Sequence, residues 1–392
     1  MSIDVARARA ETPGCAGVLH LNNAGAALMP APVLAAQVGH LQREAQIGGY
    51  EAKAEAAGRL EAVYGSVAAL IGARPEEIAL VENATVAWDL AFYSFRFQAG
   101  DRILTAEAEY ASNYLNYLRA ARRWGVLVET VPSDAAGQLD VAALEAMIDE
   151  RVRLIAVTHV PTNGGLVNPA EAIGKVARRH GIPYLLDACQ SVGQLEVDVE
   201  RIGCDLLSAT GRKYLRGPRG TGFLYVRRAI LERLDPPFLD LHSAEWVAPG
   251  RYELRPDARR FENWEFNIAG LLGLGAAVDY ALDWGLPAIA LRVAALAEEL
   301  RAWLAEIPGV TLRDLGKRHC GLVTFTVEGH EAAALRDALR ARAINVSVSD
   351  PRSTLLDATR RRLPDLLRAS VHYYNDTDEL GRFCAALREL VR

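Results

Sequence analysis

Lysine is scarce in this sequence of 392 residues, because only four of its 44 basic residues are lysines and the other 40 are arginines. Chemistry that needs a lysine amine therefore has four candidates, Lys53, Lys175, Lys213 and Lys317. Positive charge is not in excess either, since 49 acidic residues give a formal net charge of −5. This balance argues against nucleic acid or an anionic membrane as a partner and favours a small-molecule substrate.

Paired cysteines and long apolar runs are also absent. The five cysteines are scattered without a CxxC pair, which argues against a disulfide framework and a zinc site, so we expect no metal. No run of about 18 apolar residues could span a membrane, and the charged start lacks the apolar stretch of a signal peptide. We therefore expect a cytoplasmic protein with reduced thiols. A hydrophobic content of 51% suffices for one large core or two moderate ones.

Short apolar runs alternate with helical periods between about residues 75 and 226. This rhythm predicts an α/β fold with a mainly parallel sheet covered by helices. After Leu234 the period is lost in an aromatic and charged segment, which we interpret as a connection. A long Ala/Leu-rich helical tract over 268–307 then leads into a smaller α+β domain. Further helices are predicted over 32–46 and 50–71, near the domain junction or a partner subunit.

Polar residues follow several predicted strands, at the sheet edge where ligands collect in open parallel sheets. Asn83 or Thr85 could cap the helix after the first of these strands, and the free N–H groups of that helix could equally receive a phosphate. Asp187 ends a second strand, where a lone aspartate is more often a cap than a functional group. Lys213 follows a third strand, among glycines and arginines.

The surroundings of Lys213 separate it from the other lysines. Neighbouring positive charges and partial burial lower a lysine pKa and leave a free amine that can attack a carbonyl. Lys53 and Lys175 lie in predicted helices with solvated faces, and Lys317 lies in a loop of the small domain. A lysine amine, a buried carboxylate such as Asp187 and a phosphate-receiving helix end together suit pyridoxal phosphate.

Eight segments in this order resemble the class V aminotransferase and cysteine desulfurase group of fold-type I pyridoxal-phosphate enzymes. They are HLNNAGAA, ENATVAWDLA, AEYASN, THVPTNGG, LLDACQSVGQLEVDV, DLLSATGRKYLRGPRGTGFLY, RRFENWEFN and LLRASVHYYNDTDEL. The resemblance covers nearly the whole chain. It implies a large cofactor-binding domain with a mainly parallel seven-stranded sheet over residues 20–262, and a smaller α+β domain from residues 1–19 and 263–392. It also implies a homodimer with its active site at the subunit interface.

The resemblance assigns roles to individual residues. Lys213 would be the catalytic Schiff-base lysine, Asp187 the partner of the pyridine nitrogen, and Arg368 the partner of the substrate α-carboxylate. The other cofactor contacts that it implies are Tyr110 stacked on the ring, Gln190 as hydrogen-bond donor to its 3′-oxygen, Asn163 beside cofactor and substrate, and Ala84, Thr85, Thr210 and Arg212 at the phosphate. Asn23, Tyr50 and His372 are further candidates for substrate contact, although turn, core or interface roles suit them equally.

Two departures from the family pattern bear on function. Many members carry a phosphate-binding threonine for the neighbouring subunit in RFE-x-GT, whereas this chain has RFENWEF. A persulfide-forming desulfurase needs a cysteine on a small-domain loop, whereas INVSVSDPRSTLL has serines. The chain resembles more closely the branch of cysteine and sulfoxide C–S lyases, such as those of ergothioneine formation, and of isopenicillin N epimerase.

The branch resemblance favours β-elimination from a cysteine-derived or sulfoxide amino acid, through an external aldimine and a quinonoid. Transamination and epimerisation begin with the same residues and stay open, while persulfide transfer is disfavoured. A dinucleotide-dependent oxidoreductase is a poor alternative, because the only near match to its glycine fingerprint, at residues 273–275, lies inside the helical tract. A non-catalytic binding protein would have no need to retain Lys213, Asp187 and Arg368 together.

Overall fold

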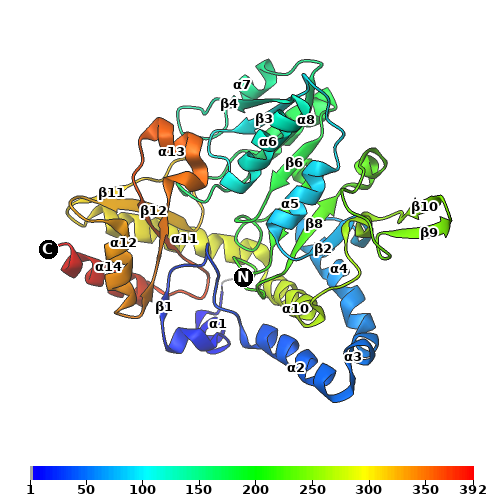
Figure 1. Ribbon diagram of the computed structural model, residues 1–392. Helices are drawn as coiled ribbons and strands as arrows, with labels where there is room; N and C mark the ends of the chain where they lie inside the picture. Colours follow the sequence, from blue (N-terminus) through cyan, green and yellow to red (C-terminus); the bar gives the residue numbers. More distant parts are fainter. Residues whose placement is uncertain (1–2) are drawn as a thin grey trace.

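A seven-stranded sheet forms the centre of the larger part of the molecule (Figure 1). The computed structural model describes residues 3–392. The strand order is β2-β8-β7-β6-β5-β3-β4, and β8 runs antiparallel to both of its neighbours while the other pairs are parallel. The strands are β2 (Ile78–Val81), β3 (Arg102–Ala106), β4 (Leu127–Val131), β5 (Val152–Thr158), β6 (Tyr184–Asp187), β7 (Leu206–Thr210) and β8 (Gly222–Val226). The predicted α/β class and seven-stranded sheet are confirmed.

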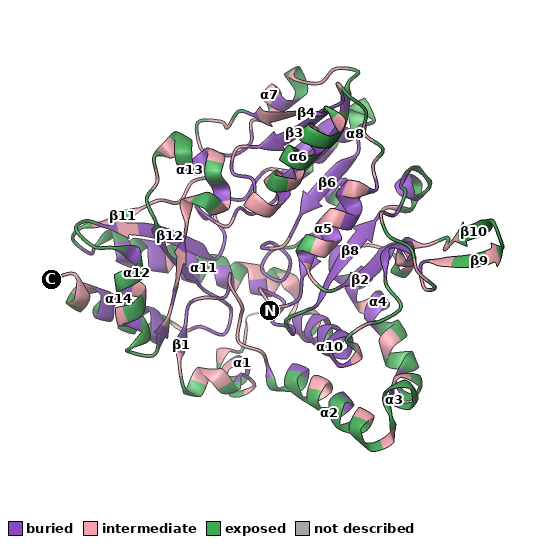
Figure 2. Cartoon of the chain, in the orientation of Figure 1, coloured by how far each residue is buried: buried purple, intermediate pink, exposed green. Residues whose placement is uncertain are grey.

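Helices cover both faces of this sheet, which is why its strands are nearly continuous apolar runs. Trp88 and Tyr117 belong to the core on one face, and Val67 and Ile173 to the core on the other. Figure 2 shows the buried strands between helices whose outer sides are exposed. The helices of this part are α2 (Ala31–Ile47), α3 (Gly49–Glu55), α4 (Ala57–Ile71), α5 (Ala84–Tyr93), α6 (Ala111–Trp124), α7 (Val141–Ala146), α8 (Ala170–His180) and α9 (Val199–Ile202).

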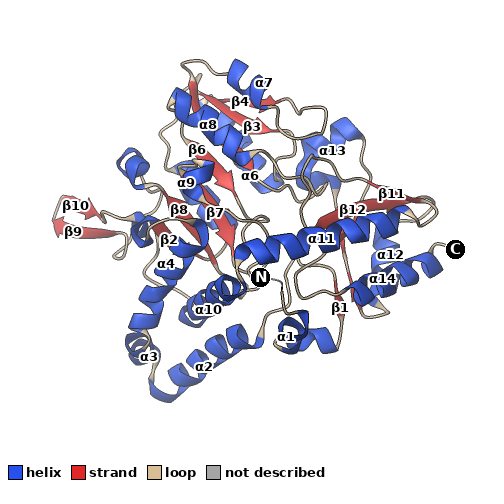
Figure 3. Cartoon of the chain, turned by 180° about the vertical axis from the view of Figure 1, so that it is seen from behind, coloured by secondary structure: helices blue, strands red, loops and turns tan. Residues whose placement is uncertain are grey.

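A four-stranded antiparallel sheet forms the centre of the smaller part, in the order β11-β12-β15-β14. The start of the chain belongs to this part too, because β1 pairs in parallel with β13 in a separate two-stranded sheet. Figure 3 shows α11 running from the larger sheet toward β11 and β12. The elements are α1 (Val5–Ala10), β1 (Leu19–His20), α11 (Leu286–Ala305), β11 (Val310–Leu312), β12 (Leu322–Val327), α12 (Ala332–Arg340), β13 (Ile344–Asn345), β14 (Ser347–Ser349), α13 (Leu355–Arg361), β15 (Leu366–Ser370) and α14 (Thr377–Leu390).

The predicted helical tract over 268–307 is two helices. α10 (Ile268–Trp284) ends at Gly285, where φ is +80° and the chain bends by 80° into α11. α10 packs against α2 and α4, and a Cβ on Gly275 would lie 2.8 Å from Val63. α10 therefore packs with helices of the larger part of the molecule.

The aromatic and charged segment after Leu234 contains regular structure that its sequence did not indicate. β9 (Ala244–Ala248) and β10 (Arg251–Leu254) form an antiparallel hairpin that projects from the body of the molecule (Figure 1). Trp246 and Tyr252 pair across it, with exposed fractions of 74% and 54%. The hairpin packs little against the core, so it leaves no hydrophobic period in the sequence.

Among residues 3–392, no single helix has both the length and the apolar composition needed to cross a membrane.

Candidate active site

A cavity of about 470 Å³ opens at the carboxyl ends of the large-domain strands. Segments that follow β2, β3, β5, β6 and β7 contribute to its wall, as expected for ligands of an open parallel sheet. Its lining residues are Glu82, Asn83, Ala84, Thr85, Val86, Tyr110, Asn113, Thr158, Val160, Thr162, Asp187, Cys189, Gln190, Thr210, Arg212, Lys213, Arg219 and Gly220. The fold thus brings together most of the residues that the sequence analysis selected, across more than a hundred positions of sequence.

Asp187 and Lys213 lie in this one cavity. Asp187 is the last residue of β6; its Oδ1 accepts the N–H of Cys189 at 2.9 Å and its Oδ2 accepts Nδ2 of Asn113 at 3.0 Å. Burial raises the pKa of Asp187, while those two hydrogen bonds and the nearby Lys213 oppose the shift. A buried carboxyl of this kind gains from a cationic partner, and a protonated pyridine nitrogen would supply one.

The loop that carries Lys213 is held by a buried arginine. Arg216 donates its backbone N–H to the carbonyl of Lys213 at 2.9 Å and has φ of +61°, a left-handed conformation rare for this residue type. Its guanidinium donates to Tyr373 Oη at 2.7 Å, lies 4.5 Å from the centroid of Tyr374, and also bonds to Thr12. The strained turn persists because these contacts fix it from the other domain.

The start of α5 forms the end of the cavity that suits a phosphate. The first turn of a helix leaves N–H groups without intrahelical acceptors. Asn83 Oδ1 accepts the N–H of Val86 at 3.0 Å, so this residue is a cap, while Ala84 and Thr85 line the cavity beside it. β8 approaches closely, since a Cβ on Gly222 would lie 3.0 Å from the Asn83 backbone. The helix start can therefore be capped by Asn83 and still bind an anion through the N–H groups of Ala84 and Thr85.

Thr210 and Arg212 also reach this cavity, each with a contact of its own. Thr210 Oγ1 donates to the carbonyl of Thr221 at 3.2 Å. The Arg212 guanidinium donates to the carbonyl of Gly25, in the loop after β1. Arg212 therefore joins the N-terminal loop to the cavity wall, a role that its sequence position did not indicate. Arg219, exposed at the rim, is a further cation that the sequence analysis left out.

The middle of the cavity has an aromatic ring and an amide with an unmet hydrogen bond. Tyr110 lines the cavity at the start of α6 and is 37% exposed. Gln190 Nε2 donates to the carbonyl of Ala24 at 3.1 Å, whereas its buried Oε1 has no partner among residues 3–392. Gln190 was predicted to donate to the 3′-oxygen, but its Nε2 is bonded to Ala24 and its free atom is an acceptor, which a ring hydroxyl could satisfy. Cys189 also lines the wall beside Lys213, and burial raises the pKa of its thiol.

Arg368 lies behind the cavity wall, next to Thr162. Its guanidinium donates to Thr162 Oγ1 at 2.7 Å and to Ser347 Oγ at 3.0 Å. Burial lowers the pKa of Arg368, because these partners are neutral and no carboxylate compensates the charge. A buried guanidinium of this kind favours binding of an anion, as a substrate carboxylate would provide.

Four predicted residues besides Arg368 stand apart from the cavity lining. Asn163 donates Nδ2 to Thr354 Oγ1 at 3.0 Å, next to Thr162, with Oδ1 buried and unpartnered. Asn23 is fully buried in bonds to Ser370 and Tyr374. His372 packs in the core and hydrogen-bonds the carbonyl of Tyr214. Tyr50 is 74% exposed and lines a different hollow between α3 and the start of α10, so within one chain it does not reach the cavity.

Sequence reasoning missed Glu109 and Asn113, which support Asp187 from behind. Both belong to the segment AEYASN that carried part of the family resemblance. Their role depends on contacts with β5 and β6, whose sequence positions are 45 and 74 residues away from Asn113. The one signal in the sequence is a Glu just before the predicted helix and an Asn in its first turn, four residues apart.

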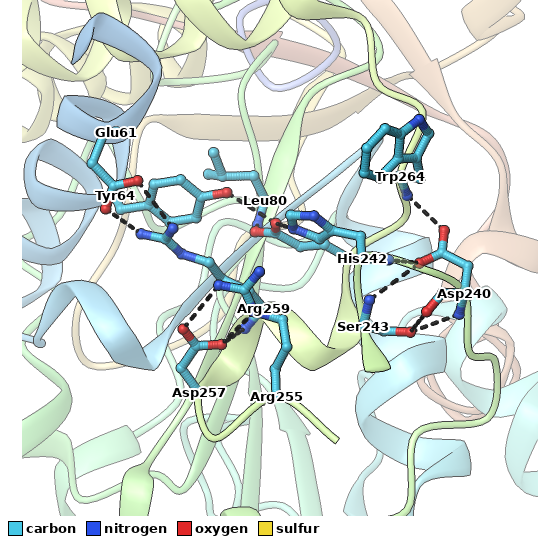
Figure 4. Close-up of polar contacts among 11 residues, drawn as sticks. Glu61, Tyr64, Leu80, Asp240, His242, Ser243, Arg255, Asp257, Arg259 and Trp264 are labelled. Carbon is cyan, nitrogen blue, oxygen red and sulfur yellow. Dashed lines mark hydrogen bonds and ion pairs between the residues drawn. The ribbon is translucent and has the colours of Figure 1, made fainter. Parts of the chain in front are cut away.

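The segment RFENWEF, which lacks the expected threonine, is anchored through Glu262. This buried carboxylate accepts Tyr64 Oη at 2.9 Å, the N–H of Leu80 at 2.7 Å and Nε2 of His242 at 2.9 Å (Figure 4). The N–H of Trp264 donates to Asp240 at 2.6 Å. These bonds fix the connection after the hairpin against β2 and α4, at the outer edge of the sheet.

The residues present fit pyridoxal phosphate at three points. The cavity offers an amine at Lys213, a buried carboxyl at Asp187 and a helix start at Ala84 and Thr85. The orphaned Oε1 of Gln190 is a fourth point, since a buried acceptor without a partner is costly unless a ligand satisfies it. This donor and charge set matches the aldehyde, ring nitrogen, phosphate and 3′-hydroxyl of that cofactor.

Comparison with known proteins agrees with this geometry. The profile of the family described as aminotransferase class-V matches residues 19–383. A probable cysteine desulfurase of Methanothermobacter thermautotrophicus is 30% identical over 378 residues, covering 95% of this chain and 94% of its own. The apo structure of a cysteine desulfurase from Thermococcus onnurineus NA1 has 30% identity and a TM-score of 0.92, covering 100% of this chain and 98% of that one.

A C-DES variant with glycine covalently linked to its PLP cofactor has 24% identity and a TM-score of 0.88, covering 97% of this chain and 99% of that one, which shows a shared fold. The profile match covers most of the chain, and the curated relatives align over more than 90% of their length. The chain therefore belongs to the class V aminotransferase family and is a pyridoxal-phosphate-dependent enzyme.

Proposed function

We propose that this enzyme cleaves a C–S bond of a cysteine-derived amino acid by β-elimination and releases the sulfur fragment. The names of the curated relatives support an activity on the C–S bond of cysteine. The observation that carries the distinction is the segment over residues 344–354, which has serines and no cysteine. Without a thiol there, a small-domain persulfide cannot form as it would in a sulfur-transferring desulfurase.

The other cysteines do not replace that thiol. Cys204, Cys320 and Cys384 are buried, and burial raises the pKa of each thiol, to about 12 for Cys204 and Cys320 and about 11 for Cys384. A thiol needs its thiolate form to act as a nucleophile. Cys189 lines the cavity and Cys15 is half-buried, and burial raises the pKa of each of these thiols as well.

Lys213, Asp187 and Arg368 divide the work of this reaction. Lys213 Nζ would hold the cofactor aldehyde, and its free amine would take the proton from the substrate Cα. Asp187 holds a proton at the ring nitrogen. Bound pyridoxal phosphate supplies an electron sink for the pair left on Cα. Arg368 binds the α-carboxylate through its buried guanidinium and orients the Cα–H bond.

Loss of the Cα proton and of the sulfur substituent on Cβ completes the elimination. The sulfur leaves with the electron pair of the C–S bond, and hydrolysis of the remaining three-carbon fragment gives pyruvate and ammonia. Thr162, which lines the cavity, accepts a hydrogen bond from Arg368 and so helps to hold the guanidinium in place for the α-carboxylate.

We further propose a homodimer in which a second copy covers the surface of α2 and α3. Leu34, Val38 and Leu41 form an exposed apolar stripe along α2, at spacings that place them on one helix face. Tyr50 is exposed at the start of α3. A partner seated there would explain the exposed apolar side chains and would offer Tyr50 a route to the other site.

The test is product analysis on the purified enzyme loaded with pyridoxal phosphate. Cysteine, cystine, cysteine conjugates and cysteine sulfoxides are supplied in turn, and pyruvate, alanine, keto acids and inverted enantiomers are measured separately. Stoichiometric pyruvate and ammonia support β-elimination. Alanine with protein-bound persulfide would overturn it in favour of sulfur transfer, and keto acid or racemised substrate alone would favour transamination or epimerisation. Lys213→Ala is the control for catalysis by free cofactor.

A further inference from the structure

Glu109 is a buried carboxyl group to which the mechanism above assigns no role. It lies in the loop between β3 and α6 and is 3% exposed. Its carboxylate accepts five hydrogen bonds, from Thr105 Oγ1 at 3.0 Å, the N–H of Tyr110 at 2.9 Å, Asn113 Nδ2 at 2.9 Å, the N–H of Thr158 at 3.1 Å and Thr158 Oγ1. All five donors are neutral, so the charge of Glu109 has no cationic partner among them.

Asn113 connects this carboxyl to Asp187. Its Nδ2 donates to Glu109 Oε1 at 2.9 Å and to Asp187 Oδ2 at 3.0 Å. An amide NH₂ has two hydrogens, and here each carboxyl takes one. Were the amide turned over, its oxygen would face two carboxyl oxygens, so the two acceptors together fix its orientation.

Glu109 is itself held from three elements. Thr105 belongs to β3, Thr158 ends β5, and the N–H of Tyr110 precedes α6. Rotation of its side chain would break several of these bonds at once. The side chain of Glu109 is therefore fixed in place. Its hydrogen bond with Asn113 fixes the amide that contacts Asp187 in turn.

Two buried carboxyl groups that share one amide raise each other's affinity for a proton. The groups that face the pair are Lys213 and Cys189 on the cavity side and the phenols of Tyr117 and Tyr184 on the core side. Lys213 is the only cation of this set, and it is committed to the cofactor aldehyde in the proposed function. A proton on the pyridine nitrogen is then the charge that this pair of carboxyls can bind.

We propose that Glu109 is a positioning residue which, through Asn113, orients Asp187 and strengthens its hold on the protonated ring nitrogen of pyridoxal phosphate. The inference rests on the role of Asp187 in the proposed function. This role explains why the amide of Asn113 donates to two carboxyl groups, which packing alone does not require.

The test compares binding of two probes to the full-length protein after removal of its cofactor. One probe is pyridoxal phosphate, and the other is its analogue with carbon in place of the ring nitrogen. Both have the aldehyde and phosphate, so the ratio of their dissociation constants isolates the contribution of the ring nitrogen. The ratio is measured by fluorescence titration for the wild type and for Glu109→Gln, Asn113→Ala and the double variant.

We expect each single variant to lower the preference for pyridoxal phosphate over the analogue by about tenfold, the effect of losing one hydrogen bond to a charged group. The double variant should lose no more than the singles, because Glu109 acts through Asn113. Glu107→Gln is the matched control: this carboxylate lies two residues earlier, pairs with Arg360 at 2.9 Å, and should leave the ratio unchanged.

An unchanged ratio in Glu109→Gln, or additive losses in the double variant, would overturn the inference. If Glu109→Gln does not fold, Asn113→Ala decides alone. An unchanged ratio of dissociation constants in Asn113→Ala would show that the amide between Glu109 and Asp187 does not affect binding of the ring nitrogen. Asp187→Asn distinguishes the two levels of the argument. If Asp187→Asn still prefers pyridoxal phosphate over the analogue as strongly as the wild type does, the assignment of Asp187 fails. If Asp187→Asn loses this preference and Glu109→Gln does not, only the role of Glu109 is refuted.

Discussion

Replacement of Arg368 by methionine separates a substrate-binding arginine from a structural one. The guanidinium is buried, donates to Thr162 and Ser347, and has no carboxylate partner, so its charge is uncompensated in the free enzyme. Removing a buried, unpaired cation relieves a desolvation cost and offsets the loss of those neutral hydrogen bonds. We expect the free energy of unfolding to change by no more than about 1 kcal/mol.

Binding of the amino-acid substrate should respond strongly to the same change. A charge-assisted pair with the α-carboxylate contributes about 1.5–3 kcal/mol, which corresponds to a loss of roughly 10- to 150-fold in affinity. The assay is a titration with a cysteine conjugate and with the corresponding amine that lacks the carboxylate. Arg368→Met should weaken binding of the first and leave binding of the second nearly unchanged.

Arg301→Met is the matched control. Arg301 is as buried as Arg368 but pairs with the buried Asp314 at 2.8 Å. Removing one partner of such a pair costs about 3–5 kcal/mol, so this variant should lose stability. If Arg368→Met destabilises the protein to the same degree, or weakens binding of both ligands equally, Arg368 is structural and the reasoning fails.

Three further predictions concern the cofactor lysine, the strained turn and one half-buried carboxyl, Asp89. Lys213→Ala should abolish the visible absorbance of covalently held cofactor and lower turnover by about 100-fold or more, and retention of either would contradict the role of Lys213. Arg216→Met should lower the free energy of unfolding, measured by urea titration, by about 3 kcal/mol, because it removes the hydrogen bonds to Leu28 and Tyr373 that hold the loop. A smaller loss of stability than in Lys175→Met would refute this role of Arg216. Burial raises the pKa of Asp89 to about 6, so the folded state binds this proton more tightly than the unfolded chain, and stability falls as pH rises from about 4 to 6 and then levels off. Asp89→Asn should therefore raise stability by about 1–3 kcal/mol above pH 6 and have no effect below pH 4, and a constant difference across that range would contradict the assignment.

The parts of the fold that bury continuous apolar segments were predictable from the sequence. Most strands of the large sheet are largely apolar because helices cover both faces, and these apolar runs can be recognised in the sequence. The hairpin of β9 and β10 left none, because its residues are largely exposed. The 268–307 tract was predicted as helical, but its break at Gly285 and the packing of α10 on α2 and α4 depend on contacts distant in sequence.

The site divides in the same way. Lys213 stood out because the chain has only four lysines and one of them follows a strand among cations, and Asp187 because it ends an apolar run. Those are properties of local sequence. Glu109 and Asn113 gained their roles only when β3, β5 and β6 were set side by side, and Thr162 only when β15 brought Arg368 next to it. Tyr50 lies outside the cavity because α3 places it beside the start of α10.

The sequence by itself determined the kind of chemistry, since residue type and strand-end position already limit which group can hold an aldehyde or a ring nitrogen. The tertiary structure alone decided which neighbours set the charge and orientation of those groups. Hydrogen bonds and burial act over a few ångströms in space, and the residues that supply them here are separated by tens to hundreds of positions along the chain.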